Sequence, residues 1–195
     1  APFGTDLLFR SHGTVPFTFH IEICEDVWTP LPPSTAGALA GAEILLNLSA
    51  SNITIGKAET RRLLCQSHSL RCVAAYVYSA AGACESTTDL AWDGQTSIYE
   101  NGLTLVESTR FPEGGQMAIA DVDLDLLRQE RARQGTFDDN RRRHGATVDC
   151  FRPVPFRLEP PLADLGFERT IERFPFVPAD ETRLEQDCYE AYNIQ

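Results

Sequence analysis

One short segment constrains the fold more than any other: an alternating run that ends abruptly at a cysteine. From Val15 to Ile23, valine, phenylalanine and isoleucine recur at every second position, with polar or small residues between most of them. A period of two is typical of a β-strand, whose successive side chains point to opposite faces. Cys24 follows directly, and three prolines between Thr29 and Pro33 prevent the strand from continuing. The sequence therefore predicts a strand that ends at a cysteine in a sharp turn.

Helix and strand patterns then alternate up to about residue 133. Helices are expected over residues 35–42, with Ser34 as N-cap, over 57–71, and over about 123–133. Strands are expected over residues 43–48, 72–78, 95–99, 103–107 and 117–122, and Asn101-Gly102 is the turn between the third and fourth of these. This order predicts a layered α/β architecture in which helices cover one face of a sheet.

The end of the chain has a different composition. Six prolines lie between Phe151 and Pro178, where they would interrupt any regular element. We therefore expect residues 1–150 to form the folded unit and residues 151–195 to form an irregular, proline-rich arm.

Composition and charge exclude several function classes. The formal net charge is -11 and the one basic run is Arg141–Arg143, so neither nucleic acid nor an anionic membrane surface is an expected partner. No apolar stretch approaches the roughly 20 residues that cross a bilayer, and the first residues lack the pattern of a signal peptide. We expect a cytoplasmic protein, and the lack of an initiator methionine suggests that something upstream was removed.

The six cysteines are scattered without metal-ligand spacing, which favours free thiols over disulfides or zinc.

Cys24 has two interpretations. A cysteine held at a strand end presents its sulfur and the following backbone N–H groups to a pocket, as an acyl-transfer nucleophile requires, but a free cysteine more often packs as a small hydrophobe. The neighbouring Glu25 and Asp26 oppose ionisation of the thiol, so a separate base is needed. His20 would lie about 13 Å away along an extended strand, so a Cys–His pair needs another histidine. Glu22, with these two acids, could form an acid–base pair, although such clusters are more often solvated or salt-bridged.

Four stretches carry a resemblance to a known family: "HIEICEDVW", "AGAEILLNLSASNITIGKAETRRLL", "AAYVYSAAGACESTTDLAWDGQTSIYENG" and "IADVDLDLLRQER". Their order and spacing over about residues 2–133 resemble the nitrilase-type carbon–nitrogen hydrolases, and most closely the glutaminase domain of the glutamine-dependent NAD synthetases. The resemblance implies a four-layer α-β-β-α sandwich, of which this chain holds part, and a catalytic Glu-Lys-Cys triad in which Cys24 is the nucleophile.

The same resemblance implies a glutamine-binding pocket. Glu25, Ser51 and Lys57 would hold the α-amino and α-carboxylate groups of glutamine, and Trp28 would form a pocket wall. Read as purely structural residues, Ser51 would belong to a turn and Lys57 to a helix start.

Several expectations concern what lies outside this sequence. The triad Glu and Lys of the family precede the cysteine at positions before Ala1, so this chain is expected to lack them and to have negligible glutaminase activity. ATP and magnesium are expected in a separate synthetase domain of the same polypeptide, and no cofactor is expected here. A homo-oligomer is expected by analogy. The alternatives are another amidase or nitrile hydrolase of the same superfamily, and a non-catalytic domain that keeps the fold.

Overall fold

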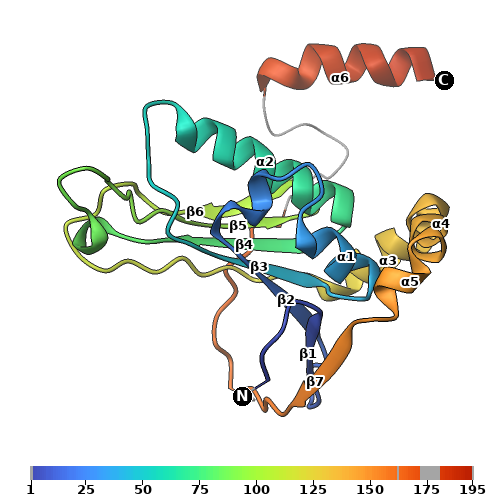
Figure 1. The fold of residues 1–195 in the computed structure, drawn as a ribbon. Helices are drawn as coiled ribbons and strands as arrows, with labels where there is room; N and C mark the ends of the chain where they lie inside the picture. The colour runs from blue at the N-terminus through green and yellow to red at the C-terminus, as the bar shows by residue number, and fades with distance from the viewer. Residues whose placement is uncertain (1, 162, 172–180, 195) are drawn as a thin grey trace.

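A single seven-stranded sheet organises the protein in the computed structural model, which describes residues 2–161, 163–171 and 181–194 (Figure 1). Its strands are β1 (Leu7–Ser11), β2 (Thr18–Ile23), β3 (Ile44–Ser49), β4 (Ala75–Ala80), β5 (Thr96–Glu100), β6 (Leu103–Glu107) and β7 (Arg152–Phe156). They follow the order β6-β5-β4-β3-β2-β1-β7. The central strands β2, β3 and β4 run parallel, so their carboxyl ends share one edge of the sheet.

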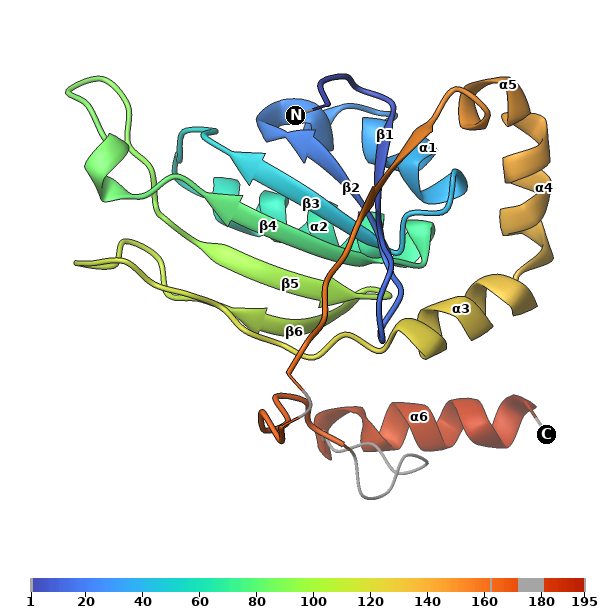
Figure 2. The same cartoon turned by 90° about the horizontal axis from the view of Figure 1, so that it is seen from below.

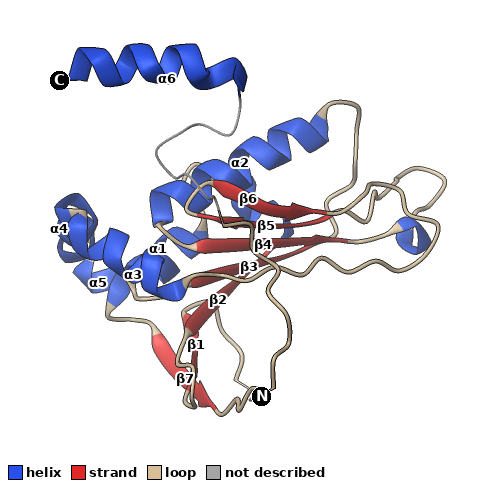
Figure 3. Ribbon diagram, turned by 180° about the vertical axis from the view of Figure 1, so that it is seen from behind, coloured by secondary structure: helices blue, strands red, loops and turns tan. Residues whose placement is uncertain are grey.

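The described helices are η1 (Cys24–Trp28), α1 (Pro33–Leu39), α2 (Lys57–Cys72), η2 (Ala83–Glu85), α3 (Leu124–Arg133), α4 (Gly135–Arg143), α5 (Gly145–Val148) and α6 (Glu181–Ile194). Five of them, α1 to α5, form two groups beside the sheet (Figure 2 and Figure 3). Helices α1 and α2 lie on the same face of the sheet (Figure 3). Helices α3, α4 and α5 gather at the end of the sheet where β3 and β4 begin (Figure 2). The predicted α/β architecture, with helices on one face, is confirmed.

The helix layer covers the polar face of β2. Thr18, His20 and Glu22 are buried, whereas Ile23, on the alternate apolar face, is 65% exposed. Leu48 pairs with Ile23 and is 58% exposed on the same side. A four-layer sandwich places a second sheet against such an apolar face, because the free energy gained on folding comes largely from removing apolar surface from water. The described residues provide one sheet of that sandwich and its helical layer.

The interior between α2 and the sheet is closely packed and rich in aromatic residues. Leu45, Tyr76, Tyr78 and Tyr99 are at most 1% exposed and form one cluster with Cys65 of α2. Three of these side chains carry hydroxyl groups that need partners when they are buried. The core of the protein therefore contains polar connections as well as apolar contacts.

Most of the predicted elements are confirmed, although the first helix begins earlier than predicted and the strand predicted over residues 72–78 lies at Ala75–Ala80. The long helix occupies Lys57–Cys72, and the hairpin turn has φ 47° at Asn101 and φ 83° at Gly102, the left-handed values that an Asn-Gly turn favours. Ser34 is not the N-cap of α1, because the helix begins at Pro33, two residues before the predicted start, where proline is well tolerated. Ser34 is instead buried, and its N–H donates to the carboxylate of Glu22.

Two predictions about strands were wrong. Residues 117–122 form no strand in the described structure, since no neighbouring strand pairs with them, and Met117 and Ile119 remain exposed. Conversely, Arg152–Phe156 forms β7 despite its prolines. Strand β7 pairs only with β1, and an edge strand tolerates proline because alternate N–H groups face away from the sheet. The division at residue 150 stays a prediction, although β7 belongs to the same sheet.

The segment after β7 crosses the open side of the sheet in Figure 2. It is fixed to the sheet at Arg169, whose guanidinium lies 2.7 Å from the buried carboxylate of Glu100. The backbone N–H of Glu168 also donates to Asp121. The expectation of an arm without regular elements was wrong, because it contains β7 and α6. Residues 157–161 and 163–171 are irregular but anchored to the sheet, while residues 172–180 lie outside the described residues. Helix α6 was not predicted. Within the described parts, no helix has both the length and the apolar character required to span a membrane.

Candidate active site

Cys24 occupies a tight turn at the carboxyl end of β2. Its φ angle is +56°, a left-handed conformation that costs a non-glycine residue about 1 kcal/mol or more. The turn continues as η1 and is held by Asp26, whose carboxylate accepts the Ile23 N–H at 2.8 Å and whose carbonyl accepts the Thr29 hydroxyl at 2.8 Å. The predicted strand-end turn is therefore present, and Asp26 has a structural role in it. The left-handed φ angle of Cys24 is strained, and strain of this kind persists only where the surrounding structure enforces it.

Three of the predicted pocket residues come together beside this turn. Lys57 Nζ donates to Ser51 Oγ at 2.7 Å and lies 5.2 Å from the centroid of the Trp28 ring. Ser51 follows β3 and Lys57 begins α2, while Trp28 ends η1. They converge because β2 and β3 are parallel neighbours, so the loops after both strands lie at one edge. Glu25, directly after the cysteine, is exposed.

Buried hydroxyl groups support this cluster from below. The phenol of Tyr78 donates to Ser49 Oγ at 2.7 Å, and Ser49 Oγ accepts the backbone N–H of Ser51 at 3.3 Å. Burial raises the pKa of Tyr78, so its phenol stays protonated and can donate. The position of Ser51 is therefore linked to the core of the sheet.

A buried ion-pair cluster fixes the loop that follows β4. Arg61 of α2 binds Asp93 with two hydrogen bonds, at 2.7 and 3.2 Å, and the two side chains are 5% and 1% exposed. Arg110 binds the same carboxylate at 3.0 Å. Burial alone would raise the pKa of Asp93, but the hydrogen bonds and charges of the two arginines hold it below its ordinary value. Beside Asp93, the indole of Trp92 donates to the carbonyl of Ala50 at 2.6 Å, next to Ser51.

A polar network that the sequence reasoning missed lies beneath Cys24. Asn47 Nδ2 donates to the Cys24 carbonyl at 3.2 Å and lies 3.4 Å from a carboxylate oxygen of Glu22. Glu22 also accepts the Tyr76 phenol at 2.5 Å. The expectation that Glu22 belongs to a solvated cluster was wrong, because it is 2% exposed. The sequence feature that could have indicated this network is the polar side chain of Asn47 in the middle of the mostly apolar strand β3.

The histidines are engaged elsewhere. His20 Nδ1 lies 2.9 Å from the Leu7 carbonyl, and His68 Nε2 lies 2.7 Å from Ser34 Oγ. Among the described residues, no hydrogen bond joins Cys24 to a histidine. All six cysteines are free, as expected. Burial raises the pKa of the Cys65 and Cys72 thiols to about 12, so these two cysteines pack as inert hydrophobes.

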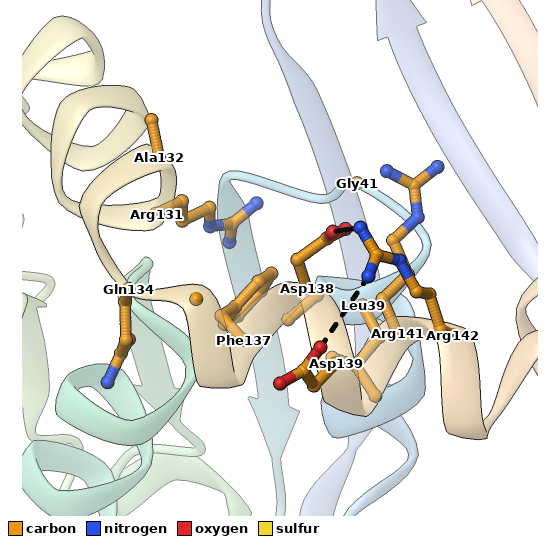
Figure 4. A pocket seen from close by; sticks show the side chains of 12 residues that line it. Leu39, Gly41, Arg131, Ala132, Gln134, Phe137, Asp138, Asp139, Arg141 and Arg142 are labelled. Atoms are coloured by element: carbon orange, nitrogen blue, oxygen red, sulfur yellow. Dashed lines mark hydrogen bonds and ion pairs between the residues drawn. The ribbon is translucent and has the colours of Figure 1, made fainter.

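A separate cavity of about 500 Å³ lies between α1, α3 and α4 (Figure 4). None of the predicted site residues lines it. The Arg131 guanidinium on its wall donates to the carbonyls of Ala42, Cys72 and Val73, and Arg142 pairs with Asp138 and Asp139. Arg141–Arg143 is therefore the charged surface of a helix, as expected, and this cavity is no part of the Cys24 site.

Comparison with known proteins relates the whole chain to one enzyme group. It is 65% identical over 195 residues to the glutamine-dependent NAD(+) synthetase of Mycobacterium leprae, which covers all of this chain and 29% of that protein. It is 63% identical over 193 residues to the protein of the same name from Mycobacterium tuberculosis, covering 99% of this chain and 28% of the relative. The chain is thus similar along its whole length to one region of the glutamine-dependent NAD(+) synthetases. It spans less than a third of the length of these relatives.

Solved structures of carbon–nitrogen hydrolases share this fold. A carbon–nitrogen hydrolase from Helicobacter pylori superposes with a TM-score of 0.54 over 70% of this chain and 50% of that protein, at 16% sequence identity. Nit3 of Saccharomyces cerevisiae, a member of the nitrilase superfamily, superposes with a TM-score of 0.51 over 60% of this chain and 41% of that protein, at 19% identity. No family model matches the sequence. The nitrilase-like fold is thus confirmed.

Proposed function

We propose that this chain supplies the nucleophile and part of the glutamine pocket of a glutaminase that releases ammonia for the amidation of nicotinate adenine dinucleotide. One observation carries the proposal: the strained Cys24 turn and the cluster of Trp28, Ser51 and Lys57 share one edge of the sheet. A half-buried cation and a hydroxyl group beside a rigid thiol suit a substrate that carries a carboxylate near a side-chain amide.

Each pocket residue has a distinct task in this proposal. The Lys57 ammonium and the Ser51 hydroxyl bind the α-carboxylate of glutamine, while the exposed carboxylate of Glu25 binds its α-ammonium group. The ring of Trp28 covers the aliphatic part of the substrate. Lys57 is already held by Ser51 and by the Asn52 carbonyl, so little side-chain entropy is lost when the carboxylate binds.

The proposed reaction is acyl transfer to sulfur. A base takes the proton of the Cys24 thiol, and the sulfur attacks the side-chain amide carbon of glutamine to form a C–S bond. Backbone N–H groups after the cysteine, with the family's lysine, stabilise the negative charge that develops on the carbonyl oxygen. The C–N bond then breaks, and the nitrogen takes up a proton and leaves as ammonia. Water adds to the thioester, the C–S bond breaks, and glutamate leaves while the thiol regains its proton.

Other parts of the full-length polypeptide complete the function. We assign the base Glu and the oxyanion-binding Lys to sequence outside this chain, so the 195 residues alone have negligible glutaminase activity. ATP and magnesium would serve the synthetase domain of the same polypeptide, which consumes the ammonia. We further propose a cytoplasmic location and a homo-oligomer, by analogy with nitrilase-type enzymes.

The test is covalent labelling of the full-length polypeptide with a diazoketone analogue of glutamine, followed by peptide mass mapping. We expect modification of Cys24 alone, suppressed by excess glutamine. The chain contains internal controls: Cys84 and Cys150 are exposed and report non-specific alkylation, whereas Cys65 and Cys72 are buried. If Cys24 stays unlabelled in the folded protein, the thiol is a packing residue and the proposal fails. Labelling that aliphatic amides suppress better than glutamine would indicate a different carbon–nitrogen hydrolase.

A further inference from the structure

We propose that Asn47 is a positioning residue for the Cys24 nucleophile, and that Glu22 and Tyr76 hold Asn47 in place. The amide of Asn47 binds the carbonyl oxygen of Cys24 and so fixes the turn that aims the thiol. This inference rests on the glutaminase function proposed above, and deepens it by assigning a role to buried groups that do not touch substrate.

The Cys24 turn requires an external support. Its φ angle of +56° is unfavourable for a residue with a side chain, so the peptide would relax if it were free to rotate. The hydrogen bond from the Ile23 N–H to the Asp26 carboxylate secures the Ile23 side of the turn. On the Cys24 side, the carbonyl accepts the Asn47 amide at 3.2 Å. One bond holds the peptide that precedes Ile23, and the other holds the peptide that follows the Cys24 Cα atom.

The side-chain amide of Asn47 can bind the Cys24 carbonyl in one orientation only, with its NH2 group toward that carbonyl. It is completely buried on β3, directly opposite Glu22 in the register of the parallel pair. Its NH2 group faces two acceptors, the Cys24 carbonyl and the Glu22 carboxylate. Rotating the amide by half a turn would place its oxygen against both acceptors, which is repulsive. The electrostatics of the site therefore select the donor orientation.

Glu22 is fixed in turn by groups from two other elements. Its carboxylate accepts the phenol of Tyr76 on β4 at 2.5 Å and the N–H of Ser34 on α1 at 3.1 Å. Burial and the neighbouring Glu22 both raise the pKa of Tyr76, so the phenol remains a donor. Ser34 also contacts His68 of α2. The support of the nucleophile thus extends through the three central strands and the helix layer.

A network with a purely structural role would stabilise the sheet without ending at the nucleophile. This network ends on the nucleophile's own carbonyl, whereas Ser51 and Lys57 are held by a separate set of bonds. Removing the Asn47 amide should therefore disturb the position of the thiol more than the binding of glutamine. A displacement of about 1 Å at a reacting atom can reduce a rate roughly 100-fold.

The experiment measures labelling of Cys24 by the diazoketone analogue in the full-length polypeptide, separating the inactivation constant KI from the maximal rate kinact. For Asn47→Ala we expect kinact to fall by about tenfold or more, with KI within about twofold of wild type. For Tyr76→Phe we expect a smaller fall in kinact, again with little change in KI. Tyr99→Phe is the matched control, because Tyr99 is equally buried on the same sheet and donates to a carboxylate, Glu107, outside the network.

The outcomes distinguish this inference from the proposed function. If folded Asn47→Ala labels with the wild-type kinact, the positioning role is refuted while the glutaminase assignment stands. If Asn47→Ala does not fold, Tyr76→Phe decides: a kinact equal to that of Tyr99→Phe overturns the inference, and a selective fall supports it. If wild-type Cys24 is not labelled at all, the proposed function fails and this inference fails with it.

Discussion

Lys57 lies over the ring of Trp28, with its Nζ atom 5.2 Å from the ring centroid, although 28 positions separate the two residues in the sequence. Lys57 is also the one lysine in the 195-residue sequence. The proposed recognition of glutamine requires a fixed ammonium group at the sheet edge that holds the nucleophile. Substitution of Lys57 tests this role directly.

Replacing Lys57 should weaken glutamine binding. For Lys57→Met in the full-length polypeptide we expect KM for glutamine to rise about tenfold or more with a smaller change in kcat, because the cation binds the α-carboxylate equally in the ground and transition states. Lys57→Arg keeps the charge and should retain most of the affinity. The measurement is glutamate release over a range of glutamine concentrations. An unchanged KM in Lys57→Met would remove Lys57 from the pocket.

Arg61 and Arg62 are adjacent on α2 and should differ sharply in their contribution to stability. Arg61 pairs with buried Asp93, and removing one partner of a buried pair typically costs about 3–5 kcal/mol. Arg62 pairs with Glu59 on the surface, where ion pairs contribute little. Urea denaturation should therefore show a large loss of stability for Arg61→Met and no measurable loss for Arg62→Met. Equal losses would contradict the burial of the Arg61 pair.

His68 should make stability depend on pH. Burial lowers the pKa of His68, an effect that Glu22 opposes and Arg71 reinforces. The unfolded chain then binds more protons than the folded protein as the pH falls below the ordinary histidine value of about 6.5, so the contribution to stability is present above that pH and is lost below it. The free energy of unfolding should decrease as the pH falls below about 6.5. The free energy of unfolding of His68→Gln should lack the part of this decrease that His68 causes. If the variant and the wild type have the same pH profile, the prediction is disproved.

Gly37 should not tolerate a methyl group. A Cβ atom there would lie 2.7 Å from Cγ of His20, whose buried ring is held by the Leu7 carbonyl. Overpacking of this kind costs about 1–3 kcal/mol, which outweighs the roughly 1 kcal/mol that alanine gains over glycine in a helix. Gly135→Ala, at the open start of α4, is the matched control and should be neutral or stabilising. Thermal unfolding compares the two, and a neutral Gly37→Ala would show that His20 can move.

Local sequence patterns determined the elements whose geometry is local. The alternation up to Ile23, the helical spacing of Lys57–Cys72 and the Asn101-Gly102 turn each follow from backbone geometry within a few residues, and each was predicted. The position of Cys24 at a strand end followed in the same way. Residues 117–122 have the composition of a strand but form none, because pairing depends on a neighbour that the local sequence does not specify.

Only the tertiary structure decided how these elements meet. It placed β7 beside β1, turned the polar face of β2 under the helices, and joined Asn47 to Cys24. A period of two reveals that a strand has two faces, but not which face is covered, because that depends on apolar surface contributed by distant segments. The sequence by itself therefore determined where the thiol sits along the chain, and long-range packing determined which buried groups hold it.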